Sequence, residues 1–185
     1  MIIIGAGGHA KTIVDALWQN GIHEGSYIDP DRQQWIEDAG YRRIEESEIP
    51  PRSKMVIGFV GLTVAALERR YRLMRDYMAQ SHYFPPVIHP SATVSRLAQL
   101  TEGCHIMAGA CVNAHATIGQ GAVINTNAIV EHDSEIGYGS HIAPGAAVLG
   151  NANVGVFSFI GCNAVVIQST AVPPRTFLKA LRHNA

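Results

Sequence analysis

The chain has 185 residues, of which 47% are hydrophobic, and this length allows one medium domain or two small ones. Its formal net charge of −1 and its lack of any Lys/Arg run argue against nucleic acid or an anionic membrane as a partner. No apolar stretch approaches the roughly 20 residues that cross a bilayer, and the start of the chain lacks the basic region and cleavage site of a signal peptide.

Residues 1–82 alternate short apolar segments with amphipathic ones, which predicts a small α/β domain built on a parallel sheet. The strands are expected at 2–4, 26–29 and 55–58. A glycine-rich turn leads from the first strand into a helix that ends near Asn20-Gly21, and a second helix is expected from 62 to about 80. This order of elements is that of a Rossmann-like mononucleotide-binding domain.

The turn at residues 5–10 formally satisfies the dinucleotide-binding fingerprint, and Asp29 lies about where a ribose-binding acid would stand. Only about 80 residues precede the next domain, which leaves room for one mononucleotide-binding half but hardly for two. His9 and Lys11 follow the glycines at a helix start, where backbone N–H groups and the helix dipole favour an anion. We therefore interpret the turn as a site for a nucleotide diphosphate. The alternative is that its glycines only let strand and helix pack closely.

A strict six-residue repeat occupies residues 88–172, after the boundary marked by Phe84-Pro85-Pro86. A helix repeats about every 3.6 residues and a strand about every 2, so a hexapeptide β-helix is the structure that explains this period. Each six-residue rung forms one side of a coil, and stacked coils bury the aliphatic residues inside a prism. A small residue stands two positions before each aliphatic one from Val94 onward. The aliphatic series is Ile88, Val94, Leu100, Ile106, Val112, Ile118, Ile124, Val130, Ile136, Ile142, Val148, Val154, Ile160, Val166 and Val172.

We therefore expect an N-terminal domain at 1–82, a β-helix at 83–172 and a short tail at 173–185. So short a prism leaves apolar flank exposed, which a trimer would cover. The three cysteines lack the spacing of zinc ligands, and Cys104 falls on a small inward position of the repeat. Reduced thiols in the cytoplasm are the simplest interpretation, and the cytoplasm is the expected location.

The most concentrated set of reactive side chains surrounds His132, which is followed by Asp133. His141 is flanked by inward residues and should point out of the prism. It follows His132 by nine residues, about half of an 18-residue coil, so the two can share a site only across a boundary between chains. One coil above His132 comes Gly150, which has no side chain to block a ligand beside the imidazole. A histidine with an acidic neighbour can act as a general base near neutral pH.

Two other interpretations of these histidines stay open. Outward histidines on a β-helix are commonly solvated surface residues. Some hexapeptide β-helices also bind zinc through histidines shared between subunits, but this needs three convergent ligands with two of them close together. The spacings among His105, His115, His132 and His141 do not match that pattern, so we expect no metal.

Three motifs occur in an order that resembles the NeuD/PglD-type sugar acetyltransferases. They are the opening Ile-Ile-Gly-Ala-Gly-Gly-His-Ala-Lys, the junction Phe-Pro-Pro-Val-Ile-His-Pro-Ser-Ala at 84–92, and Ile-Asn-Thr at 124–126 leading into Val-Glu-His-Asp at 130–133. The similarity covers nearly the whole chain. It implies a Rossmann-like nucleotide-sugar domain followed by a left-handed parallel β-helix, and a homotrimer. The handedness is taken from the resemblance.

The resemblance also implies roles for individual residues. His132 corresponds to the general base, Asp133 to its acidic neighbour, and His141 to a second histidine of the active site. Residues matching those that line an acetyl-CoA slot between chains are Asn125, Gly150 and Cys162. Residues matching the nucleotide-sugar site are Gly7, Gly8, His9, Asp29 and Gly58, with Asp29 near the base and ribose.

The chain departs from the family pattern in two places. Phe59 follows Ile57-Gly58 where many relatives have Asn, which alters part of the sugar contact. The repeat is expected to end at Val172, before Pro173-Pro174, whereas the family usually adds about another coil that helps to hold the coenzyme. Residues 176–181 are expected to cap the open prism instead.

The sequence therefore predicts a homotrimeric acetyltransferase that moves acetyl from acetyl-CoA to a nucleotide-activated amino sugar. The expected acceptor is a UDP-linked 4-amino-dideoxy sugar used in surface-glycan or glycoprotein synthesis, with His132 taking the proton from the amine. The alternatives are O-acetylation of sialic acid or a related sugar, and a non-catalytic nucleotide-sugar-binding trimer.

Overall fold

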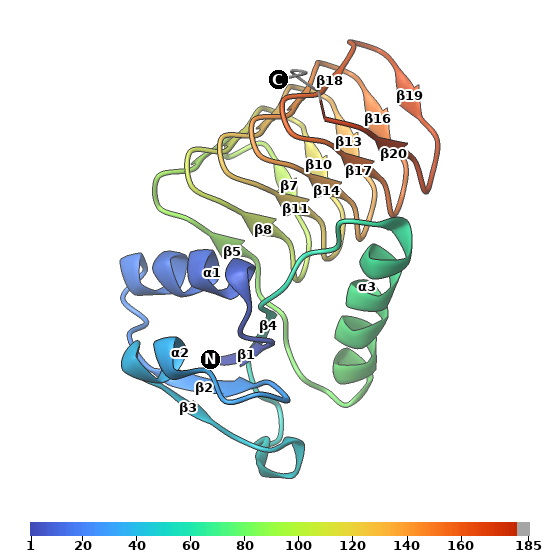
Figure 1. The fold of residues 1–185 in the computed structure, drawn as a ribbon. Coiled ribbons are helices and arrows are strands. Elements are labelled where there is room, and N and C mark those ends of the chain that lie inside the picture. Colours follow the sequence, from blue (N-terminus) through green and yellow to red (C-terminus); the bar gives the residue numbers. More distant parts are fainter. Residues whose placement is uncertain (181–185) are drawn as a thin grey trace, which may run out of the picture.

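The computed structural model describes residues 1–180 and has two parts (Figure 1). A small four-stranded parallel sheet with helices on both faces comes first. A prism of three parallel sheets follows, in which sixteen short strands wind round a single core. Helix α1 lies between the N-terminal sheet and the first coil of the prism, and α3 runs beside the prism (Figure 1).

The N-terminal sheet has the strand order β3-β2-β1-β4. Its central strand β1 is buried on both faces, as an unbroken apolar run predicts. Ile3 faces α1, whereas Ile2 and Ile4 face the opposite layer with Met74 and Tyr77 of α3. The elements are β1 (Ile2–Ile4), α1 (Gly8–Gln19), β2 (Gly25–Ile28), α2 (Gln34–Asp38), β3 (Tyr41–Arg43), a 3-10 turn η1 (Glu46–Glu48), β4 (Met55–Ile57) and α3 (Val64–Ala79).

The predicted strands and both predicted helices of this domain are present, within one to three residues at their ends. Three short elements, α2, β3 and the turn η1, were not predicted. Each is too short to show a period, and β3 adds only an edge strand beside β2. Helix α1 ends at the predicted Asn20, whose side-chain amide donates to the carbonyl oxygens of Ala16 and Ile88. This contact ties the end of α1 to the first strand of the prism.

The prism is built from strands of two residues that recur every six. Residues 18 apart pair in register, as His105, Val123 and His141 do. The three sheets have the orders β19-β16-β13-β10-β7, β20-β17-β14-β11-β8-β5 and β18-β15-β12-β9-β6. The strands are β5 (Val87–Ile88), β6 (Thr93–Val94), β7 (Gln99–Leu100), β8 (His105–Ile106), β9 (Cys111–Val112), β10 (Thr117–Ile118), β11 (Val123–Ile124), β12 (Ile129–Val130), β13 (Glu135–Ile136), β14 (His141–Ile142), β15 (Ala147–Val148), β16 (Asn153–Val154), β17 (Phe159–Ile160), β18 (Val165–Val166), β19 (Ala171–Val172) and β20 (Phe177–Leu178).

The core of the prism consists of the predicted aliphatic residues and the small residues two positions before them. Serine at a small position is compatible with burial because its hydroxyl reaches the backbone. Ser134 donates to the carbonyl oxygen of Leu149, and Ser140 to that of Gly155. The left-handed β-helix predicted from the sequence is confirmed.

The predicted end of the repeat at Val172 is one rung too early. Strand β20 pairs with β17, and Leu178 continues the six-residue series. The prolines that suggested a break lie in a turn, and Pro174 takes the turn position that Pro144 takes five rungs earlier. Proline fits there because the rung does not need its N–H group. Residues 176–180 thus form a rung instead of a separate cap, and residue 181 lies outside the described residues.

Ile136→Asp should prevent the β-helix from folding. The side chain of Ile136 is 2% exposed and packs between the coils above and below it, so the substitution would bury an unpaired charge at a cost of several kcal/mol. Circular dichroism during thermal unfolding measures the effect. Gln99→Asp is the matched control, because Gln99 points outward on the same sheet. Equal melting temperatures for the two variants would contradict the stacked core.

Candidate functional site

His132 lies in the turn after β12, and its imidazole is held by the next residue. Its Nδ1 is 2.8 Å from Oδ2 of Asp133, so in the neutral ring Nδ1–H donates and Nε2 is left as an acceptor. Asp133 adopts a φ of +60°, a left-handed conformation that Asp tolerates better than most residues. Both side chains are more than half exposed, at 56% and 54%. An imidazole that a carboxylate orients in this way can act as a general base.

Gly150 lies directly above the imidazole of His132. A Cβ on Gly150 would come within 2.8 Å of Cε1 and Nε2 of that ring. The sequence interpretation left this space for a ligand, but in the structure the ring itself fills it. The stacking predicted from the 18-residue spacing is present. Because Gly150 has no side chain, the imidazole of His132 can occupy the space beside it.

His141 points out of the prism, as predicted, but it is covered by the N-terminal domain. It is 1% exposed, its Nδ1–H donates to the carbonyl oxygen of Gly61 at 3.0 Å, and its Nε2 accepts from the amide of Asn125 at 2.9 Å. Burial, together with the nearby charge of Arg70, lowers the pKa of His141 to about 4. His141 is therefore neutral near pH 7, with both ring nitrogens occupied.

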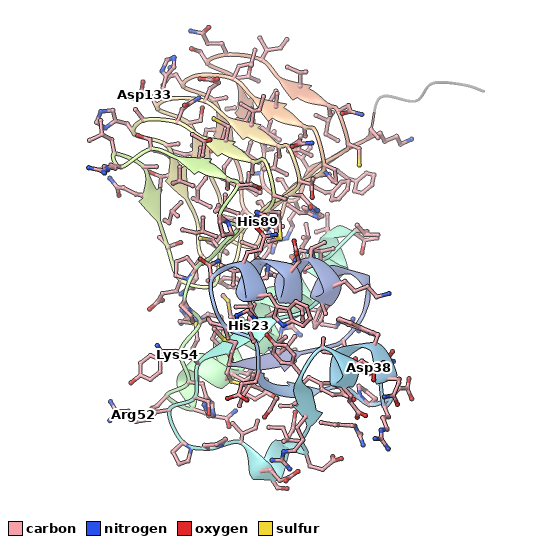
Figure 2. All side chains as sticks on the ribbon, turned by 90° about the vertical axis from the view of Figure 1, so that its left-hand side faces the viewer. His23, Asp38, Arg52, Lys54, His89 and Asp133 are labelled. Atoms are coloured by element: carbon pink, nitrogen blue, oxygen red, sulfur yellow. The ribbon has the colours of Figure 1, made fainter. Side chains whose placement is uncertain are left out.

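The predicted site residues fall into two groups on one chain. Asn125, His141 and Cys162 belong to the rungs of β11, β14 and β17, which stack in one sheet, and Cys162 is exposed in a turn. His132 and Asp133 follow a strand of another sheet. In Figure 2, Asp133 lies at the edge of the prism away from the N-terminal domain, whereas His89 lies at the junction of the two parts.

The three glycines that were predicted to bind the nucleotide sugar have different structural roles. A Cβ on Gly7 or Gly8 would meet nothing within 4 Å, and φ of Gly7 is an ordinary −79°. Neither packing within the chain nor backbone conformation requires glycine at these two positions. At Gly58, in contrast, a Cβ would collide with the carbonyl oxygen of Gly5. Gly58 is therefore required where the ends of β1 and β4 approach each other.

Asp29 holds the same turn from the end of β2. Its Oδ2 accepts from the N–H of Ala6 at 2.7 Å, and its Oδ1 accepts from the N–H of Asp31 at 3.0 Å. It also borders a cavity of about 570 Å³ between the sheet and α3, together with Phe59 and Arg69. The cavity opens at the carboxyl ends of β1, β2 and β4, where ligands of open parallel sheets bind.

His105 and Arg70 meet His9 at the contact between the domains, and no role was predicted for either of them from the sequence. Nε2 of His9 is 3.1 Å from Nδ1 of His105, and the guanidinium of Arg70 lies against the other side of His105. Burial, followed by the charge of Arg70, lowers the pKa of His9 to about 3. The same causes place the pKa of His105 well below its usual range. In the sequence, Arg70 is one of several arginines on a predicted helix, and nothing marks it as buried.

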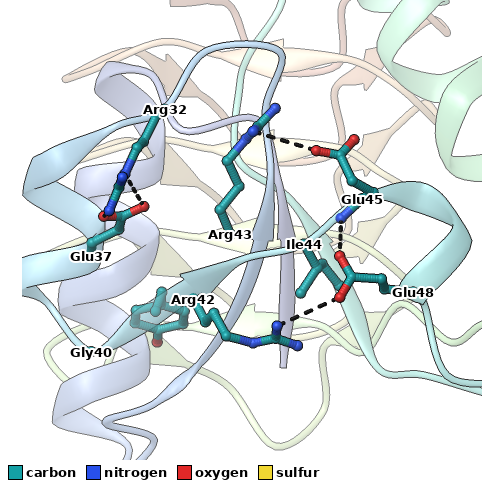
Figure 3. Close-up of a pocket in the computed structure, with 9 residues that line it drawn as sticks. Arg32, Glu37, Gly40, Arg42, Arg43, Ile44, Glu45 and Glu48 are labelled. Carbon is teal, nitrogen blue, oxygen red and sulfur yellow. Dashed lines mark hydrogen bonds and ion pairs between the residues drawn. The ribbon is translucent and has the colours of Figure 1, made fainter.

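A second cavity, of about 630 Å³, lies at the edge strand β3 (Figure 3). Its charged side chains pair with one another, as Arg32 does with Glu37 and Arg42 with Glu48. They are not directed at a common point. Within residues 1–180, no group of three or more His, Cys, Asp or Glu side chains is placed to hold a metal ion. In the same part of the chain, no helix combines the length and apolarity that crossing a membrane requires.

Comparisons with known proteins agree with this architecture. The PglD N-terminal domain family matches residues 1–61, and a search of curated proteins finds no match. The acetyltransferase domain of PglB from Neisseria gonorrhoeae FA1090, solved in complex with acetyl coenzyme A, is 29% identical with a TM-score of 0.87. The alignment covers 97% of this chain and 87% of that one.

Two further solved structures share the fold over nearly the whole chain. PerB from Caulobacter crescentus, in complex with CoA and GDP-perosamine, is 25% identical with a TM-score of 0.70. WeeI from Acinetobacter baumannii AYE is 18% identical with a TM-score of 0.74. Each alignment covers 97% of this chain and 93% of the other. The resemblance found in the sequence is thus confirmed, and the chain is an acyltransferase in which residues that match the PglD N-terminal domain are joined to a hexapeptide β-helix.

Proposed function

We propose that the chain transfers the acetyl group of acetyl-CoA to the amino group of a nucleotide-activated sugar. The observation that carries the proposal is His132, which is oriented by Asp133, seated on Gly150 and left with Nε2 free of any partner within residues 1–180. Similar proteins with acetyl-CoA, or with CoA and GDP-perosamine, support this reaction class. A UDP-linked 4-amino-dideoxy sugar is the acceptor that we propose, for surface-glycan or glycoprotein synthesis.

In this reaction Nε2 of His132 accepts the proton from the attacking amine. The new N–C bond forms as the C–S bond of the thioester breaks, and the proton leaves with the thiolate of CoA. Asp133 stabilises the imidazolium that exists between these events, because its carboxylate accepts from Nδ1–H. The transfer is direct, within a ternary complex, and needs no covalent intermediate on the enzyme.

A homotrimer would complete the site. The outward residues of the sheet that contains β12 are mostly apolar, and Ile129 and Val165 are 37% and 52% exposed. The sheet that contains β13 instead presents Thr117, Glu135 and Asn153. Packing the apolar face against a neighbouring chain would cover it and bring His132 to that neighbour. Asn125, Gly150 and Cys162 are then proposed to line the acetyl-CoA slot between chains.

The acceptor is proposed to bind through the N-terminal domain. Its diphosphate would lie on the N–H groups at the start of α1, where Gly7 and Gly8 leave open space and His9 adds a ring nitrogen. Asp29 would lie near the nucleoside. Gly58 contributes indirectly, by letting β1 and β4 approach. The additional rung at β20 weakens the non-catalytic alternative, which rested on a β-helix ending at Val172.

Thiol release from acetyl-CoA, measured against a panel of acceptors, tests the proposed reaction. The panel contains UDP-linked and GDP-linked 4-amino sugars, the corresponding sugars that carry hydroxyl in place of the amine, and free sialic acid. We expect release with a nucleotide amino sugar and N-acetyl product by mass spectrometry. Release with sialic acid alone would favour O-transfer, and no release with any acceptor would favour the binding trimer.

His132→Ala should lower kcat by about 10² to 10⁴, the usual contribution of a general base. The melting temperature should stay near that of the wild type, because the ring is more than half exposed. His115→Asn is the control, since His115 is an exposed histidine one coil below Asp133. A kcat for His132→Ala within about threefold of the wild type would rule out the base assignment.

Gly150→Ala should displace the imidazole of His132 and lower kcat by about 10²-fold, because proton transfer depends on placement at the ångström scale. The KM for the acceptor should change little, because the acceptor is proposed to bind through the N-terminal domain. Steady-state kinetics with the folded variant measures this effect. An unchanged kcat would show that the position of the ring is not set by Gly150.

Gly8→Val should raise the KM for the acceptor by about tenfold or more, equivalent to about 1.4 kcal/mol. The new side chain has open space within the chain, so folding and acetyl-CoA affinity should be preserved. Calorimetric titration with UDP and with acetyl-CoA separates the two sites. Equal loss of both affinities would indicate a folding defect, and binding of NAD without UDP would favour a dinucleotide site.

A further inference from the structure

Arg70 is a buried charge without a buried counter-charge. It lies on α3, is 2% exposed and makes no ion pair within residues 1–180. Its guanidinium donates to the carbonyl oxygens of Phe59 and Gly121, and Nη2 lies 3.4 Å from both ring nitrogens of His105. Burial lowers the pKa of Arg70 to about 10, so it is still protonated at neutral pH. Burying an unpaired charge in this way lowers the stability of the folded chain unless a charge of opposite sign compensates it.

The neutral partners of Arg70 fix the direction of a chain of hydrogen bonds. A guanidinium only donates, so a nitrogen of His105 must accept from it. If Nδ1 accepted, Nε2–H would point at a cation and would have no acceptor among the described residues. Nε2 is therefore the acceptor, and Nδ1–H donates to Nε2 of His9. The two rings are inclined by 18°, with their centroids 5.4 Å apart, which is compatible with this hydrogen bond.

The chain of hydrogen bonds ends at the glycine-rich turn. Because Nε2 of His9 accepts, its Nδ1 carries the hydrogen, and this nitrogen lies 3.3 Å from Oγ1 of Thr12. The hydroxyl of Thr12 donates in turn to the carbonyl oxygen of His9. Nδ1–H of His9 therefore donates to Thr12, in the first turn of the helix that begins at Gly8. The N–H groups of Arg70 and His105 thus both point along the chain of bonds towards His9.

We propose that Arg70 is a positioning residue for the diphosphate of the acceptor: through His105 it fixes the ring of His9 and directs positive potential to the turn at Gly7 and Gly8. The inference rests on the proposed function, in which this turn binds a nucleoside diphosphate. In a weakly screened interior the charge acts over a longer distance than it would in water. The bound anion would compensate the charge that the folded chain leaves unpaired.

Within residues 1–180, the other titratable groups along this chain of bonds add no charge at neutral pH, whereas Asp29 adds its carboxylate at the turn itself, where it accepts from the N–H of Ala6. His141 on β14 and Cys104, next to β8, are the remaining titratable side chains near it. The pKa of His141 is lowered to about 4 and that of the Cys104 thiol is raised to about 12, in both cases chiefly by burial. The positive charge therefore comes from Arg70, while His9 and His105 stay neutral and transmit it by polarisation.

The test compares binding of UDP and of uridine by calorimetry in the full-length protein. Arg70→Met should weaken UDP binding by about tenfold or more and leave uridine and acetyl-CoA binding nearly unchanged. Arg70→Lys keeps the charge and should restore much of the UDP affinity. Arg72→Met removes an exposed arginine from the same helix and should behave as the wild type. Equal losses for UDP and uridine, or no loss for UDP, would overturn the proposal.

A second measurement does not depend on binding or on the stability of Arg70→Met. Nitrogen-15 NMR of the histidine rings should show His9 and His105 neutral in the wild type, each with its hydrogen on Nδ1. A hydrogen on Nε2 of either ring would overturn the proposal even if no variant folds. Wild-type protein that binds no nucleoside diphosphate would also overturn it. Absence of acetyl transfer with UDP binding intact would contradict the proposed reaction alone.

Discussion

The stacking register of the β-helix is the constraint on which the rest of the structure depends. Residues 18 apart in sequence pair in space, and the six-residue rung decides which of three faces each side chain occupies. The register places Gly150 one coil above His132, next to its imidazole. It also stacks His105 and His141 on the face that the N-terminal domain covers. The periodic backbone therefore determines where the histidines of the prism lie, and the neighbouring side chains are of a size that fits them.

The two parts of the chain meet through a buried polar contact. His9, Arg70 and His105 join the first turn of α1, the middle of α3 and the second rung of one sheet. The carbonyl oxygen of Gly61 and the ring of His141 add a contact between the loop after β4 and the prism. A polar contact of this kind has only one arrangement that satisfies every donor, which fixes the orientation of the glycine-rich turn on the prism.

The sequence predicted the structure best in the β-helix, where the six-residue period determines the position of each residue. The core of the prism, the separation of His132 from His141, and the contact of His132 with Gly150 all follow from counting in sixes and eighteens. The burial of Arg70 could not be predicted, because neighbouring arginines on α3 are alike in sequence and only packing against the prism selects one. The rung at β20 was hidden by prolines whose turn position became clear only in the fold. Gly58 was assigned to a ligand, although it serves the approach of two strands.

The contact between His132 and Gly150 restricts where residues can be inserted into or deleted from such a β-helix. Inserting a single rung between these two residues would move the glycine to a different face and place another residue above the imidazole. Only a whole coil keeps every face aligned, and even that would separate His132 from Gly150 by a new layer. Insertions and deletions that spare the site are therefore confined to the ends of the prism and to loops that leave a turn and return to it. The spacing between His132 and Gly150 is therefore fixed, whereas the length of the chain on either side of them can vary.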